Sequence, residues 1–270
     1  MNTRYAFPLC IQLAVPDDIY HDKNFKATLQ LLKEYGFYGV ELNITDFDNI
    51  KPLELTGYLS DFDLKLTMVA TGMYAKQNGL SLSSLDEETR KKTVQHMNKI
   101  MAFAEQAKAG IICGFIKGGP DNNVAAATKQ MELSLLELSR LELVNQVDIY
   151  LEATNHYEAT LVNTVLEGVN FSAKAGTCIK ILPDTYHMNI EETNMFAAMV
   201  KYQNYYKNIH ISDNNRYFPG LGGIDFFAII SVLKSLNYSG TITIEGRCLK
   251  GLHEDIAVAA NYIHNVSQRI

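Results

Sequence analysis

Four residues that could bind a metal ion or transfer a proton stand at or near the ends of four short apolar runs in the second half of the chain. They are Glu152, Asp184, His210 and Glu245, in the runs DIYLEA, IKILPD, NIHI and TITIE. Three carboxylates and one imidazole are a hard, oxygen-rich ligand set, which suits Mn, Mg or Co better than a structural zinc. A buried carboxylate is costly unless it is paired or bound to a metal, so the four together indicate a divalent-metal site.

These four runs belong to a longer alternation of strand-like and helix-like segments. The expected strands cover residues 8–14, 39–44, 65–71, 110–116, 148–153, 178–184, 208–213 and 241–246, and helical spacing is clear at 25–36 and 84–107. Such alternation implies a parallel sheet. The chain has 270 residues and no Gly- or Pro-rich linker. Because a (β/α)8 barrel takes about 250 residues, we predict an α/β protein with one domain, residues 1–270, folded as an eight-stranded parallel TIM barrel.

The candidate ligands share one side of their strands. Glu245 shares a face with Thr243, whereas Ile242 and Ile244 point the other way, because side chains alternate along a strand. The other three ligands have the same phase. Residues at the carboxyl ends of barrel strands converge on one rim, where TIM-barrel active sites lie. The pattern therefore predicts one shared site.

Composition excludes several classes of partner. The net charge is −6 and no Lys/Arg cluster stands out, so the sequence predicts no basic surface that would bind nucleic acid. The N-terminal apolar run is too short to span a bilayer, which argues against a membrane partner. The four cysteines are far apart and have apolar neighbours, which indicates buried free thiols in a reducing, cytoplasmic environment: Cys10, Cys113, Cys178 and Cys248.

Polar residues after the strand ends extend the pattern into longer motifs. The segments LEATNHYE, PDTYHMNIEE, HISDNNRYFPGLGGIDF and ITIEG resemble the D-tagatose 3-epimerase family, one of the sugar phosphate isomerase-epimerases with a xylose isomerase-like barrel, along essentially the whole chain. The resemblance implies that the four candidate ligands hold one divalent metal ion, Mn before Mg or Co. It implies that Glu158, His187 and Arg216 bind the first oxygens of a ketose, and that Glu152 and Glu245 also transfer protons. It further implies a homo-oligomer, either a dimer or a tetramer.

The chemistry of carbonyl compounds supports these metal-binding and proton-transfer roles. A metal ion beside a ketone and its neighbouring hydroxyl stabilises the cis-enediolate that forms when the C3 proton leaves. One carboxylate removes that proton and the opposite one returns a proton to the other face, which inverts the carbon. We therefore predict a metal-dependent 3-epimerase that acts on a ketose or a ketose phosphate.

Other activities stay open on a barrel of this kind. Return of the proton to the adjoining carbon would give an aldose–ketose isomerase, for example on hydroxypyruvate. Expulsion of a β-hydroxyl would give a polyol dehydratase of the inosose type. A DNA-repair enzyme like endonuclease IV needs a histidine-rich three-zinc cluster, for which only His210 and His187 are available. A sugar-binding barrel without catalysis would not need the proton-transfer pair.

Several further residues near the predicted rim allow more than one role. Lys117 and Arg247 are candidates for a phosphate site with neighbouring glycine N–H groups, or else are solvated rim charges. Lys180 faces the barrel interior and needs a partner, and Glu41 is a candidate support for the ligands. The connection 72–83 is either a lid or a surface insertion. Candidates for aromatic walls of the sugar pocket are Tyr5, Phe7 and Tyr74.

Overall fold

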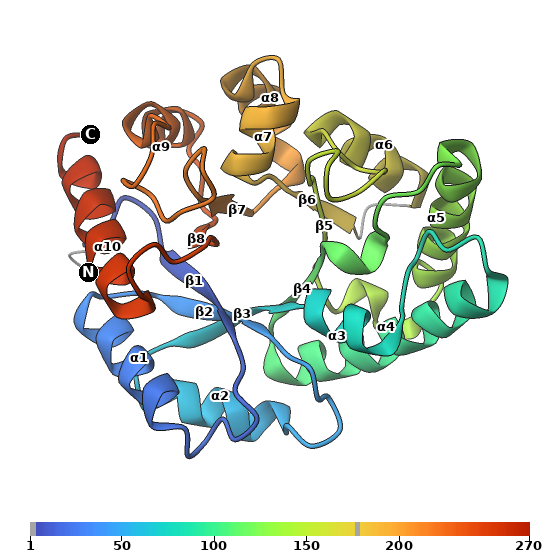
Figure 1. Cartoon of the computed structure of the whole chain (residues 1–270), viewed down its shortest axis with the longest axis horizontal. Coiled ribbons are helices and arrows are strands. Elements are labelled where there is room, and N and C mark those ends of the chain that lie inside the picture. Colours follow the sequence, from blue (N-terminus) through green and yellow to red (C-terminus); the bar gives the residue numbers. More distant parts are fainter. Residues whose placement is uncertain (1–3, 176–178) are drawn as a thin grey trace.

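The computed structural model describes residues 4–175 and 179–270, which form eight parallel strands surrounded by helices (Figure 1). The strands are β1 (Leu9–Ala14), β2 (Gly39–Asn43), β3 (Lys65–Ala70), β4 (Gly110–Cys113), β5 (Ile149–Glu152), β6 (Ile179–Leu182), β7 (Asn208–Ile211) and β8 (Thr241–Ile244). All eight predicted strands are present, which confirms the α/β TIM-barrel fold. The strands are shorter than predicted. The end of the fourth predicted strand, residues 115–117, instead forms a 3-10 turn, η1 (Phe115–Lys117). Cys178, the first residue of the sixth predicted strand, lies outside the described residues.

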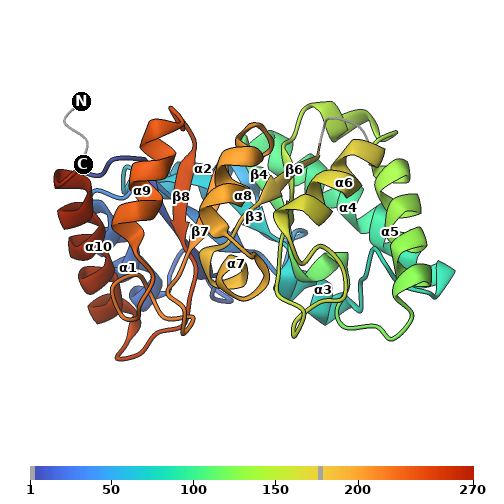
Figure 2. The same cartoon turned by 90° about the horizontal axis from the view of Figure 1, so that it is seen from above.

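Helices cover the outside of the strands in chain order, as Figures 1 and 2 show. They are α1 (Lys23–Glu34), α2 (Pro52–Ser60), α3 (Gly72–Asn78), α4 (Glu87–Ala107), α5 (Val124–Leu138), η2 (Glu142–Asn145), α6 (Val165–Ala175), α7 (Thr185–Glu191), α8 (Met195–Lys201), η3 (Gln203–Tyr205), α9 (Phe226–Ser235) and α10 (Leu252–Gln268). The two predicted helical windows correspond to α1 and α4. Within the described ranges, no helix is both long and apolar enough to cross a membrane.

The predicted alternation of side chains separates two apolar layers. Ile242 and Ile244 are buried in the main core between strands and helices, where each such side chain contributes about 1.5–3 kcal/mol of transfer free energy. A smaller cluster fills the barrel interior and consists of Met68, Ala70, Ile112, Tyr150 and Leu182. The strand phase inferred from the sequence is therefore the one the fold uses, which directs the polar strand-end residues inward.

The barrel is nearly closed, and its least regular joint lies at the candidate site. The strand order is β6-β5-β4-β3-β2-β1-β8-β7, so β6 and β7 are not joined by a ladder among the described residues. An isolated parallel bridge joins Asp184 to His210, and the His210 N–H donates to the carbonyl of Pro183 at 2.9 Å. Pro183 has no N–H of its own to donate. Two candidate ligands thus hold the two sides of this joint together.

The cysteine prediction holds for part of the described chain. Cys10 and Cys113 are buried free thiols, and burial raises the pKa of both. Cys248 is also free but exposed, so its predicted burial was wrong. Cys248 lies in the connection between β8 and α10 rather than in a strand. Its apolar neighbour Leu249, in the same connection, is exposed as well.

Candidate metal and substrate site

The four predicted ligands meet at the carboxyl ends of β5 to β8. Glu152 ends β5, Asp184 lies directly before α7, His210 lies in β7 and Glu245 follows β8. One potential ligand atom from each residue lies within 4.8 Å of those of the other three. Glu245 is partly exposed and the other three are buried. Three carboxylates and one imidazole in this arrangement could hold a divalent cation.

Asp184 has two different roles at its two oxygens. Its Oδ1 accepts the backbone N–H groups of Tyr186 at 2.8 Å and His187 at 3.2 Å, so it caps the start of α7. Its Oδ2 accepts from Arg216 Nη1 at 2.6 Å. The helix start therefore fixes the orientation of this carboxylate, and Oδ2 remains directed towards the other ligands.

His210 is held from inside the barrel by Glu41 of β2. The His210 Nε2 lies 2.9 Å from Glu41 Oε2, and both side chains are fully buried. Glu41 Oε1 accepts from Asn208 Nδ2 at 2.5 Å and from Thr243 Oγ1 at 2.7 Å. Because Nε2 faces this carboxylate, Nδ1 is the nitrogen left for the ligand cluster, 3.0 Å from Glu245 Oε2. Glu41 therefore contacts a candidate ligand, as predicted, and does so from a position deeper in the barrel than the rim.

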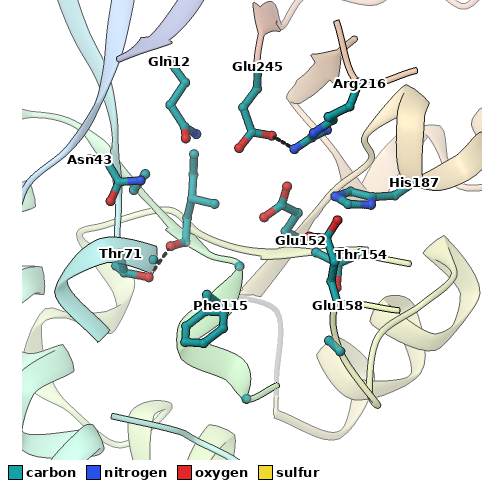
Figure 3. A pocket seen from close by; sticks show the side chains of 16 residues that line it. Gln12, Asn43, Thr71, Phe115, Glu152, Thr154, Glu158, His187, Arg216 and Glu245 are labelled. Carbon is teal, nitrogen blue, oxygen red and sulfur yellow. Dashed lines mark hydrogen bonds and ion pairs between the residues drawn. The ribbon is translucent and has the colours of Figure 1, made fainter. Parts of the chain in front are cut away.

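The crowded carboxylates make the site strongly attractive to positive charge. Burial opposes the charging of His210, but Glu41 and Glu245 outweigh it and raise the pKa of His210 well above its usual value. Burial also disfavours the charged form of Glu245, yet Arg216 and His210 prevail and hold its pKa well below the usual range. Arg216 donates to Glu245 Oε2 at 2.6 Å (Figure 3). The donor set and its charge therefore fit a divalent cation.

The three predicted substrate residues line the same pocket as Glu152 and Glu245 (Figure 3). Glu158 and His187 come from the segments after β5 and β6, and Arg216 comes from the segment after β7. His187 Nδ1 accepts the backbone N–H of Asn155 at 3.1 Å. The ring proton of a neutral His187 is therefore on Nε2, which can donate to an oxygen atom.

A buried aspartate holds the loop that carries Arg216. Asp213, which is 1% exposed, accepts backbone N–H groups from four residues at 2.8 to 3.1 Å: Asn214, Gly220, Gly222 and Ile224. Arg216 itself adopts a left-handed conformation with φ +66°. Asp213 thus fixes an unusual loop conformation that brings the Arg216 guanidinium to the carboxylates.

The first half of the chain supplies a pocket wall that sequence reasoning missed. It includes Gln12, Asn43, Thr71 and Phe115, which Figure 3 shows around the same space. Gln12 is a polar residue on an otherwise apolar strand, and Asn43 shares β2 with Glu41, so polar strand positions are a signal that could have identified them. Phe115 lies in the predicted strand 110–116, but the chain turns at η1 and presents its ring, 50% exposed, beside the pocket.

The aromatic residues predicted as pocket walls lie elsewhere. Tyr5 packs edge-on against Phe37, and its hydroxyl donates to a backbone carbonyl. Phe7 packs against Tyr238, and Tyr74 against Phe47. These predictions were wrong because aromatic residues also fill the helix–strand layer, and residue type alone does not distinguish the two places.

The connection 72–83 forms a fixed wall of the pocket. Its first half is α3, and Gly72 lines the pocket. Leu80 and Leu82 are buried. The N–H of Leu82 donates to the Ile116 carbonyl at 2.9 Å, and that of Ser83 to the Lys117 carbonyl at 3.2 Å. These contacts attach the segment to η1, so the geometry favours a packed element over a lid.

The three unassigned basic residues have different surroundings. Lys180 pairs with Asp148 at 2.5 Å, which supplies the partner that its inward position required. Arg247 is exposed, as a rim charge should be. Lys117 is only 1% exposed, so the prediction of a solvated rim charge was wrong for it. Its side chain turns into the protein towards the end of β5.

Comparison with known sequences gives consistent relatives. The profile of the xylose isomerase-like TIM barrel family matches residues 29–264. The 3-dehydro-D-guloside 4-epimerase of Escherichia coli is 26% identical over 252 residues, which cover 88% of this chain and 92% of that protein. A probable ketose 3-epimerase of Synechocystis is 26% identical over 82% of this chain and 78% of its own length. A D-psicose 3-epimerase of Enterocloster bolteae is 33% identical over 50% of this chain and 46% of its own length.

Comparison with solved structures supports the same fold. The D-allulose 3-epimerase from Methylomonas sp., in complex with D-allulose, superposes with a TM-score of 0.80 at 18% identity and covers 98% of both chains. The apo 3-keto-D-glucoside 4-epimerase from E. coli gives 0.79 at 22% identity, covering 97% of this chain and 99% of that one. With the profile match, these findings confirm the resemblance inferred from the motifs: the chain belongs to the xylose isomerase-like TIM barrel family.

Proposed function

We propose that this protein is a metal-dependent sugar epimerase, an isomerase-class enzyme that inverts carbon 3 of a ketose. The observation that carries the proposal is the position of Glu152 and Glu245. They belong to one possible metal cluster, and both line a pocket that also contains Glu158, His187 and Arg216. Relatives of this chain are named as epimerases of D-psicose, L-ribulose and a 3-dehydro-D-guloside.

In this proposal the four clustered residues Glu152, Asp184, His210 and Glu245 would hold the metal, with Mn favoured over Mg or Co. When bound, the ion supplies positive charge beside the carbonyl and its neighbouring hydroxyl, which stabilises a cis-enediolate. One of the two glutamates accepts the C3 proton as the C–H bond breaks, and that electron pair moves towards the carbonyl oxygen. The other glutamate, which starts the step protonated, donates that proton to the opposite face of C3, which restores the carbonyl and inverts the centre.

The remaining polar residues would orient the sugar. Arg216 presents a charged guanidinium and His187 can present Nε2–H, so both can donate to the oxygens on carbons 1 and 2. Glu158 accepts hydrogen bonds from hydroxyl groups. These contacts would keep C3 between the two glutamates, since proton transfer requires close approach of donor and acceptor.

The surroundings of the rim favour a free ketose over a ketose phosphate. The sequence offers Lys117, Arg247 and the N–H groups of their neighbouring glycines as a phosphate site. Lys117 is buried and turned inward. At the start of α10, Asp255 Oδ2 accepts the N–H groups of Leu249 at 2.5 Å, Lys250 at 3.2 Å and Gly251 at 3.4 Å. The backbone N–H groups that follow Arg247 are thus already bonded to a carboxylate and are not free to bind a phosphate.

The other activities lack comparable support. The relatives do not favour an aldose–ketose isomerase or a polyol dehydratase. We also retain as predictions a single domain over residues 1–270, a homo-oligomer and a cytoplasmic location.

The test is a panel of ketoses incubated with the protein and Mn2+ in D2O. We expect deuterium at C3 together with the C3 epimer, measured by NMR. Exchange confined to C1 or C2 would instead indicate an isomerase, and loss of the 3-hydroxyl would indicate a dehydratase. The ligand set is tested separately with Asp184→Asn: stoichiometric metal retained by this variant would contradict the proposed cluster.

A further inference from the structure

Lys117 is a buried cation directly behind the strand end that carries Glu152. It is the last residue of η1 and is 1% exposed. Its Nζ donates to the backbone carbonyl of Glu152 at 2.7 Å and to Thr154 Oγ1 at 2.6 Å. Both acceptors belong to the exit of β5, where the chain passes from the strand into the pocket wall.

The burial of this ammonium group is energetically costly. Transfer of a charged amine from water is unfavourable unless hydrogen bonds or opposite charges compensate. Burial lowers the pKa of Lys117 to about 8, while the carboxylates of Glu152 and Glu158 partly oppose that shift. Both direct acceptors are neutral, so the side chain is not held there by a salt bridge with either of them. A leucine or methionine would fill such a place at lower cost if packing were its only role.

The turn that carries Lys117 is itself fixed. Its N–H donates to the Gly114 carbonyl at 3.2 Å, and its carbonyl accepts the N–H of Ser83 at 3.2 Å. Gly118 has φ +124°, and a Cβ there would lie 2.0 Å from Ser83 Oγ. The ammonium group is therefore attached to a rigid support rather than to a mobile loop.

We infer that Lys117 is a positioning residue that fixes the β5 exit, and with it Glu152, for metal binding and proton transfer. This inference rests on the proposed function. Glu152 must reach both the metal cluster and the C3 proton, so its backbone has little freedom to move. Without Lys117 the Glu152 carbonyl and the Thr154 hydroxyl lose their shared donor, and the strand end can shift. A misplacement of about 1 Å can cost on the order of 100-fold in rate.

The experiment compares Lys117→Met with Lys180→Met. Both exchanges replace a lysine by an unbranched neutral side chain, but Lys180 pairs with Asp148 at the amino-terminal side of the barrel, outside the site. We expect Lys117→Met to raise the Kd for Mn2+ about 10- to 100-fold, as removal of supporting contacts does at metal sites. At saturating Mn2+ we expect kcat on D-psicose to fall while KM stays close to wild type. Lys180→Met should leave both quantities unchanged.

A purely structural role would lower thermal stability without changing Mn2+ affinity in the folded protein. Unchanged Mn2+ Kd and kcat in Lys117→Met would therefore overturn the inference while leaving the proposed function intact. If the wild type neither binds Mn2+ nor epimerises any ketose, the proposed function fails and the inference fails with it.

A second pair of variants keeps the inference testable if Lys117→Met does not fold. Thr154→Val removes the hydroxyl that accepts from Lys117 with little change in shape, and Thr154→Ser retains it. We expect Thr154→Val to raise the Mn2+ Kd and Thr154→Ser to keep it. Equal Mn2+ affinity in the two variants would contradict the coupling between Lys117 and the β5 exit.

Discussion

The two halves of the barrel contribute different kinds of residue to one pocket. The β5–β8 half supplies the charged groups to which we assign the reaction: the four clustered residues, with Glu158, His187 and Arg216. The β1–β4 half lines the pocket with neutral side chains, including Gln12, Asn43, Thr71 and Phe115. Two charged residues of this half, Glu41 and Lys117, are buried and contact the reactive half from behind. We propose that one half performs the chemistry, while the other shapes the space and fixes the reactive groups.

The largest effect should come from the reactive half. Glu245→Gln removes a proton-transfer group and changes a proposed ligand while keeping the side-chain shape. General acid–base catalysis contributes about 10²–10⁴-fold, so we expect kcat to fall by at least that factor. The measurement is epimerisation of D-psicose together with deuterium exchange at C3, at saturating Mn2+.

Thermal stability and metal content provide the control for Glu245→Gln. The side chain is partly exposed, so the substitution should leave the fold intact. A variant that folds, binds Mn2+ and still epimerises at the wild-type rate would exclude Glu245 from proton transfer.

The next prediction tests whether a substitution in the β1–β4 half can lower activity only by moving a reactive group. A Cβ at Gly114, directly before η1, would lie 2.2 Å from Glu152 Oε2. That atom is the end of a flexible side chain, so Gly114→Ala should move the carboxylate at little cost in stability. Misplacement of a reacting group costs up to about 100-fold, and we expect kcat/KM to fall accordingly while Tm changes little.

Gly119→Ala is the matched control for that experiment. Gly119 follows the same turn, and a Cβ there would meet no heavy atom within 4 Å. Equal activity of Gly114→Ala and Gly119→Ala would show that Glu152 does not need its present position.

A smaller effect is expected from Glu41, the buried residue that contacts His210. Glu41→Gln keeps the size of the side chain but replaces a carboxylate oxygen that faces His210 Nε2. Loss of such a partner typically weakens metal affinity about 10- to 100-fold, so we expect the Mn2+ Kd to rise by that factor. Glu34→Gln, at the exposed end of α1, is the comparison. A Glu41→Gln protein with wild-type Mn2+ affinity would assign Glu41 to the barrel core alone.

The same contrast explains what could be predicted from the sequence. Glu152, Asp184, His210 and Glu245 interrupt apolar strands at one phase, and a charge in such a place is rare enough to be informative. Phe115 gave no such signal, because an aromatic residue is expected both in a core and in a pocket. The burial of Lys117 could not be predicted, because it depends on the turn at η1 and on Thr154, two features that lie far apart in the sequence. Local patterns thus predicted the strands and the four clustered residues, whereas tertiary packing decided the wall and its supports.

The smallest effect should come from the neutral wall itself. Gln12→Ala removes a side chain that faces the pocket from β1 and that has no part in the metal cluster. A hydrogen bond between neutral groups contributes about 0.5–1.5 kcal/mol, so kcat/KM for D-psicose should fall only about 2- to 12-fold, mainly through KM. The Mn2+ Kd should stay at the wild-type value, because Gln12 is not one of the four clustered residues. The loss should differ from one ketose to another, since a wall residue acts through the shape and polarity of the space. A loss in kcat as large as that of Glu245→Gln would mean that β1 takes part in the chemistry, and the division between the two halves of the barrel would not hold.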